Sequence, residues 1–165
     1  MSLVQSALIQ LSAANDYFLR STRGLQESHS TFAPSPGMMT VAQQVAHAAH
    51  TIDWFVEGAF RPEGFDTNFE QHAKTVNAYT SLTAARAWFD KAIASATSIV
   101  STKTDADLMA ALPAGPILGG APRMAVFGAL TDHTAHHRGA LTVYARLQGV
   151  VPPMPYMETR EAPPR

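Results

Sequence analysis

The chain has 165 residues, of which 46% are hydrophobic, with no cysteine and a formal net charge of −1. This length and apolar content suit one folded domain with a proper core and exclude an intrinsically disordered chain. Lysine and arginine are scattered, so the sequence offers no basic face of the kind that binds nucleic acid. Without cysteine, a metal ion would depend on nitrogen and oxygen ligands.

The first ten residues, MSLVQSALIQ, lack the basic region and the long apolar run of a signal peptide. No uninterrupted apolar stretch approaches the roughly 18 residues that a membrane-spanning helix needs. The sequence therefore predicts a cytoplasmic protein that does not cross a membrane.

Two helices are expected in the first part of the chain. Residues 2–27 carry apolar side chains at helical spacing, with Gly24 near the end of the segment. A turn-rich stretch with prolines follows at residues 29–37. The second helix begins at Thr40, because Gln43 three residues later completes a capping box. Its apolar stripe consists of Val41, Val45, Ala48, Ile52, Phe55 and Val56.

The second helix also carries polar residues that can contribute to a site. His47 and His50 lie three residues apart on a face that adjoins the apolar stripe. One of the two can point inward while the other lies nearer the margin, and the spacing does not decide which. Asp53 and Glu57 add carboxylates, although most such residues face water.

The middle of the chain alternates long loops and a helix. Residues 61–79 are expected to form a loop, in which His72 is interpreted as a surface residue rather than a metal ligand. A third helix is predicted over residues 82–100, with a strongly apolar stripe. Residues 101–121 are too rich in glycine and proline for a continuous helix and form a second long connection.

The fourth helix lies between Pro122, which suits a first turn, and Gly149, which suits the left-handed residue after the last turn. His133 and His137 are four residues apart in its apolar stripe, which places their Cβ atoms roughly 5–6 Å apart on one face. Two such imidazoles can bind one metal ion. The alternative is a pair of core histidines satisfied by hydrogen bonds.

Four amphipathic helices, no convincing strand and two long crossovers predict an all-α fold, a single four-helix bundle over residues 1–165. The proline-rich tail can pack across one end of this bundle through Met154, Tyr156 and Met157, or can meet a second subunit. A third histidine from the second helix would complete a three-histidine site with an open coordination position. Asp53, Glu57 and His50 remain alternatives for a general base.

The late helix contains HxxHHRG, followed by ARLQG and a Gly-x-x-Pro-Pro ending, and the second helix contains Thr-x-x-Gln-x-x-x-His. These motifs resemble those of the DinB/YfiT-like four-helix bundle family. Carried over position by position, the resemblance implies a metal triad of His47, His133 and His137. His50 and His136 are the nearest alternatives. Many members have glutamine after HRG, where this chain has Ala140.

The resemblance also implies a function. Characterised members include thiol-dependent transferases and isomerases, and others are described as metal-dependent hydrolases. We therefore expect a divalent metal ion, zinc or nickel before iron or manganese, and a small-molecule substrate, including a low-molecular-weight thiol. The alternative is a non-catalytic metal-binding or ligand-binding stress-response protein. Related bundles commonly pair, so we expect a homodimer, with Trp54, Phe60 and the Met/Tyr tail as candidate contacts. Within the chain, we expect Arg138 to make a contact at a helix end or between helices rather than to touch the substrate.

Overall fold

The structure is a computed structural model that describes residues 1–157. Its helices are α1 (Leu3–Thr22), the 3-10 helix η1 (Glu27–His29), α2 (Val41–Phe60), α3 (Phe69–Asn77), α4 (Leu82–Ser101), α5 (Asp105–Met109) and α6 (Ala125–Leu147). Within residues 1–157 there is no strand, and a lone antiparallel bridge joins Ala111 to Pro122.

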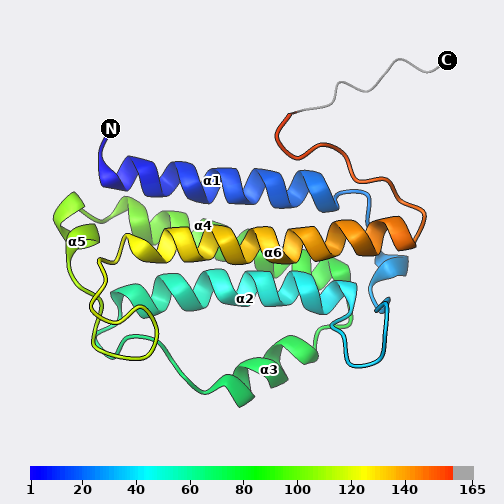
Figure 1. The fold of residues 1–165 in the computed structure, drawn as a ribbon, viewed down its shortest axis with the longest axis horizontal. Coiled ribbons are helices and arrows are strands. Elements are labelled where there is room, and N and C mark those ends of the chain that lie inside the picture. The colour runs from blue at the N-terminus through cyan, green and yellow to red at the C-terminus, as the bar shows by residue number, and fades with distance from the viewer. Residues whose placement is uncertain (158–165) are drawn as a thin grey trace.

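The four long helices form a bundle in which α1 and α2 lie at opposite corners and each packs against both α4 and α6. α1 and α6 run in one direction, while α2 and α4 run in the other (Figure 1). Backbone and side-chain hydrogen bonds support this arrangement, because Ser30, just after η1, bonds to the first turns of both α2 and α4. The predicted all-α four-helix bundle is therefore confirmed.

Helix α2 is buried on almost every side because α3, α4 and α6 all pack against it. Short side chains make this close packing feasible, since both α2 and α4 bury many alanines: Ala42, Ala46, Ala48, Ala49 and Ala59 on α2, and Ala85, Ala92 and Ala96 on α4. On the other side of α4, the rings of Phe18 and Phe89 stack with centroids 4.3 Å apart. These contacts fix the position of α2, which carries part of the candidate site.

The ends of three helices test the sequence predictions. At the start of α2 the capping box is present, because Thr40 Oγ1 accepts the N–H of Gln43 and Gln43 Oε1 accepts the N–H of Thr40. After α6, Gly149 is left-handed with φ +76°, as predicted. α1 ends at Thr22 rather than at residue 27. The backbone at Gly24 then approaches the segment after α6 so closely that a Cβ there would lie 2.7 Å from Val150 Cγ1.

The prediction that α6 begins at Pro122 is wrong by three residues. α6 begins at Ala125, whose N–H bonds to the carbonyl of Pro122 at 2.9 Å. Pro122 itself belongs to the bridge with Ala111, which holds the end of the preceding connection. The turn residues therefore mark the approach to the helix rather than its first turn.

Both connections that were expected to be loops contain helices. Residues 61–81 return along the outside of the bundle and carry α3, whereas residues 102–124 stay at one end and carry α5 (Figure 1). Only the first of the two is a true crossover. α3 begins at Phe69 and is capped by Asn68, whose side chain accepts the N–H of Gln71. Val76 is the one residue of α3 that is buried, and a single buried position does not make a recognisable apolar stripe in the sequence.

The described part of the tail packs against α1 and α6. The carbonyl of Pro155 accepts a hydrogen bond from Arg20 at 3.1 Å, and the ring of Tyr156 meets that of Tyr17 edge-on at 5.0 Å. The Arg138 guanidinium lies 5.6 Å from each of these two tyrosine rings. Arg138 thus makes contacts between elements, as predicted. Across residues 1–157, no helix combines the length and apolar character needed to span a membrane.

Candidate metal centre

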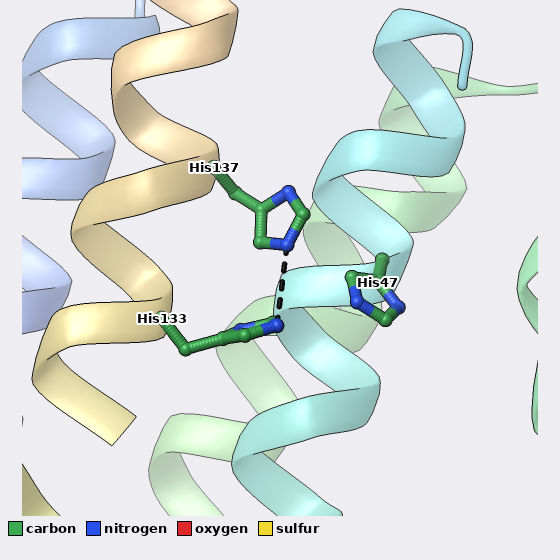
Figure 2. A group of neighbouring side chains, drawn as sticks. All are labelled: His47, His133 and His137. Carbon is green, nitrogen blue, oxygen red and sulfur yellow. Dashed lines mark hydrogen bonds between the residues drawn. The ribbon is translucent and has the colours of Figure 1, made fainter. Parts of the chain in front are cut away.

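Three histidines from two helices meet inside the bundle. His47 lies in the second turn of α2, and His133 and His137 occupy successive turns of α6, which packs alongside α2 in the opposite direction. One ring nitrogen from each lies within 4.8 Å of the others, and the Nε2 atoms of His133 and His137 are 3.3 Å apart (Figure 2). This cluster can hold a metal ion.

A chain of hydrogen bonds orients His137. Its Nδ1 atom contacts Oε1 of Gln44 at short range, and Nε2 of Gln44 lies 3.4 Å from the hydroxyl of Tyr144. That hydroxyl donates to the carbonyl of Met39 at 3.2 Å, so it is free to accept from the amide of Gln44. The Gln44 oxygen then accepts the Nδ1–H of His137, which leaves the Nε2 lone pair directed at the other two histidines.

His133 has no comparable support. Its Nδ1 atom is buried without a hydrogen-bond partner among residues 1–157, and its Nε2 atom faces Nε2 of His137. Buried polar side-chain atoms are normally paired, because an unpaired one loses its hydration without compensation. The polar partners of this imidazole are therefore other imidazoles.

Comparison with known proteins identifies the family. The family model described as DinB superfamily matches residues 10–141, which include all three histidines. The chain belongs to the DinB superfamily. A DinB-like protein from Bacillus cereus superposes with a TM-score of 0.73 at 21% identity, covering 91% of this chain and 95% of that one. A DinB-like protein from Bacillus subtilis gives a TM-score of 0.56 at 18% identity, covering 92% and 96%. No curated protein matches the chain.

Burial favours the neutral form of the three clustered histidines in this DinB-superfamily chain. Desolvation, followed by the neighbouring histidines, lowers the pKa of His137 to about 3 and that of His133 to about 4. Desolvation also lowers the pKa of His47. At neutral pH all three imidazoles therefore have lone pairs available, and no proton has to leave before a cation binds.

This pKa shift predicts a pH-dependent stability. The metal-free folded state resists protonation of imidazoles whose ordinary pKa is 6.5, whereas the unfolded chain accepts those protons. Stability is therefore fully present above that value and is lost as the pH falls toward about 4. Urea unfolding of metal-free protein at about pH 7 and about pH 5 checks this, and the midpoint should be lower at the acidic value. An equal midpoint at both values would contradict the assignment.

Carboxylates contribute less between about pH 7 and about pH 5. Hydrogen bonds in the folded state lower the pKa values of Glu27, Asp66 and Asp107 from ordinary values of 4.5, 3.8 and 3.8, and the unfolded chain takes up those protons only below this window. A His133→Gln/His137→Gln double variant should lose much of the pH dependence. His136→Gln is the matched control and should retain it, because His136 is exposed.

The remaining histidines take different places. His136, one of the two alternatives, is exposed on α6 and meets the His137 ring edge-on at 4.9 Å. His50, the other alternative, lies beside the cluster but outside it, and its ring packs 4.7 Å from that of His72. His72 is not the surface residue that we expected, because α3 turns its side chain inward until it is 16% exposed.

One cavity adjoins the histidine cluster, and a second cavity lies next to the first. The first, of about 390 Å³, is mostly apolar and has no Lys, Arg, Asp or Glu in its lining: Met39, His47, His50, Thr51, Trp54, Phe55, Phe69, His72, Ala73, Val76, Asn77 and His133. The second, of about 290 Å³, is polar: His50, Asp53, Trp54, Glu57, Gly58, Arg61, Asp66, His72 and Trp88. They share His50, Trp54 and His72 as a common wall.

Neither Gln44 nor the contribution of α3 to the site is among the predictions from the sequence. Gln44 lies three residues before His47 on α2, and its side chain is buried. A polar residue within an otherwise apolar helix face is the signal that could have identified it. Phe69 and Val76 of α3 line the apolar cavity. No local pattern indicates this, because the packing of a crossover on a distant helix depends on the whole fold.

Proposed function

We propose that His47, His133 and His137 bind a divalent metal ion, zinc or nickel in preference to iron or manganese. All three donors are imidazoles, which suit zinc and nickel, whereas manganese favours carboxylate oxygens. The separation of 3.3 Å between Nε2 of His133 and Nε2 of His137 supports the proposal. Two nitrogens bound tetrahedrally at about 2.0–2.1 Å from zinc would be roughly 3.3–3.4 Å apart.

The observation that carries the proposal is the environment of His133. Ordinary core packing accounts for His137, whose Nδ1 bonds to Gln44. It does not account for His133, which has a buried unpaired nitrogen and meets other imidazoles with its second nitrogen. A cation held between them would give the two facing nitrogens, Nε2 of His133 and Nε2 of His137, a common partner.

We further propose that the protein is a metal-dependent enzyme of the thiol S-transferase or hydrolase type that acts on a small molecule. Three protein ligands leave one coordination position open. A bound metal ion would lower the pKa of a water or thiol there. Trp54, Phe55 and Phe69 supply apolar walls that hold an uncharged substrate and keep bulk water away. The volume of about 390 Å³ suits a small organic molecule.

Elemental analysis of purified protein, followed by cobalt substitution, tests this function. A thiolate-to-cobalt charge-transfer band on addition of 2-mercaptoethanol would demonstrate the open position. Reaction of the thiol with 1-chloro-2,4-dinitrobenzene indicates a transferase, and turnover of p-nitrophenyl acetate indicates a hydrolase. Metal binding with neither reaction would favour the alternative, a non-catalytic binding protein. Protein that binds no divalent metal refutes the proposal.

Replacing Gln44 by leucine should weaken metal binding by about 10–100-fold, because the ring of His137 loses the acceptor that fixes its tautomer and orientation. Competition with a chromogenic chelator measures this change. Gln43→Leu is the matched control, since the side chain of Gln43 bonds at the start of α2 and to the carbonyl of Asn77. Equal affinity in the two variants would show that Gln44 does not support the site.

We also retain a homodimer as a proposal, with the tail as its contact surface. Of the expected contacts, Trp54 is engaged within the chain, where its Nε1–H donates to the carbonyl of Asp66. Phe60 lies beneath the Lys103 ammonium at 4.9 Å. In the tail, by contrast, Met154, Tyr156 and Met157 are more than half exposed. Light scattering at two concentrations tests this proposal.

A further inference from the structure

His72 stands where the two cavities meet. Its ring lines the apolar cavity together with His47 and His133, and it also lines the polar cavity. On the polar side, its Nε2 atom lies 3.2 Å from Oδ2 of Asp66. One imidazole therefore borders the space next to the proposed metal ion while it is paired with a carboxylate.

Asp66 is itself held in place by its neighbours. Its Oδ1 atom accepts the backbone N–H of Asn68 at 2.9 Å, and its carbonyl accepts the Nε1–H of Trp54 at 2.7 Å. The hydrogen bond from Asn68, followed by that from His72, holds the pKa of Asp66 below its usual range. Asp66 is therefore an acceptor at neutral pH, so His72 donates its Nε2–H, and in the neutral ring the lone pair is on Nδ1.

The other candidates for acid–base chemistry are less suited to it. Burial, followed by repulsion from His72 and His47, lowers the pKa of His50 to about 4, and within residues 1–157 His50 forms no ion pair with a carboxylate. Asp53 accepts the Nε1–H of Trp88 at 2.7 Å, and burial raises its pKa. His72 thus combines a place in the lining of the apolar cavity with a hydrogen-bonded carboxylate partner.

We propose that His72 is the acid–base catalytic residue of this site and that Asp66 is its positioning residue, an inference that rests on the metal-dependent function proposed above. When a thiol enters the apolar cavity, its S–H proton passes to Nδ1 of His72 and the sulfur becomes a thiolate. The thiolate then attacks the electrophilic carbon of an organic co-substrate, and a carbon–sulfur bond forms while the bond from that carbon to its leaving group breaks. The leaving group departs with the bonding pair and receives the proton from the imidazolium, so the net proton change on the enzyme is zero.

Several charged or titratable groups line the two cavities beside His72. From α2 and its end these are His47, His50, Asp53, Glu57 and Arg61, from the crossover Asp66, and from α6 His133. The carboxylates on the polar side outnumber the single arginine there. A proton taken up by His72 would therefore lie beside more acidic than basic side chains.

Proton counting tests the proposal without requiring turnover. Zinc-loaded protein is titrated at neutral pH with 2-mercaptoethanol by calorimetry in buffers of different ionisation enthalpy, which gives the number of protons released per thiol bound. Wild type should release well under one proton, because His72 keeps it. His72→Gln should release close to one and bind the thiol at least about tenfold more weakly. Asp66→Asn should release an intermediate number.

Lys74→Gln is the matched control, because Lys74 lies on α3 and pairs with Glu70 at the surface. It should behave as wild type. Zinc content, measured first on every variant, separates the two proposals, since a wild type without zinc refutes the metal site itself. Zinc-loaded wild type that binds no thiol, or equal proton release by wild type and His72→Gln, overturns the role of His72 and leaves the metal site intact.

Discussion

Replacing His137 by alanine should weaken zinc or nickel binding by at least about 100-fold, or about 3 kcal/mol. This change removes a donor atom, whereas the loss of an orienting partner alone costs about 10–100-fold. The Nε2 atoms of His137 and His133 lie 3.3 Å apart, so the variant removes one of the two nitrogens that α6 would supply to the metal ion. Isothermal titration of metal-stripped protein measures the affinity.

His136→Ala is the matched control for this experiment, because it removes an exposed imidazole from the adjacent position of the same helix. Its affinity should equal that of wild type. Full metal stoichiometry with unchanged affinity in His137→Ala would eliminate the proposed site. Added zinc should also raise the melting temperature of wild type, because a ligand that binds the folded state stabilises it, and the rise should be much smaller in the His137→Ala protein.

Replacing Phe89 by alanine should lower the free energy of unfolding by about 3–5 kcal/mol. Phe89 is fully buried on α4 and stacks on Phe18 at a centroid distance of 4.3 Å, so the variant leaves a cavity between α4 and α1. In a chain of this length the melting temperature should fall by roughly 10 °C. Urea denaturation and a thermal melt measure the two quantities.

Phe69→Ala provides the comparison, since it removes the same ring from a position that is 55% exposed on α3. It should cost less than about 1 kcal/mol. Phe89→Ala should still bind metal at temperatures where it is folded, because α4 contributes no side chain to the triad. Together with His137→Ala, this separates loss of stability from loss of the site. A loss of stability no larger than that of Phe69→Ala would contradict the proposed packing.

Local chemistry made much of this fold predictable. The long helices are predictable because apolar residues recur at helical spacing, and the Thr40 capping box and the left-handed Gly149 mark two of their ends within a residue or so. The pairing of His133 with His137 follows from the same periodicity. In the structure His47, rather than His50, lies beside them, and its role as a metal ligand stays a proposal.

The rest depends on contacts between distant segments. α3 offers nine residues with one buried side chain, too short a pattern to separate from a loop, and it is stabilised by packing on α2. The inward position of His72 follows from that packing. Gln44 is similar, because its importance lies in bonds to His137 and to Tyr144, which is a hundred residues away.

The crossover has a consequence for how this binding site can diversify. α3 packs chiefly on α2, yet it supplies Phe69, His72, Ala73, Val76 and Asn77 to the apolar cavity. Mutations in this segment can reshape the cavity while the interfaces among the four long helices remain intact. Selection can therefore retune ligand preference at little risk to foldability, and randomising residues 61–81 would be an economical route to altered specificity.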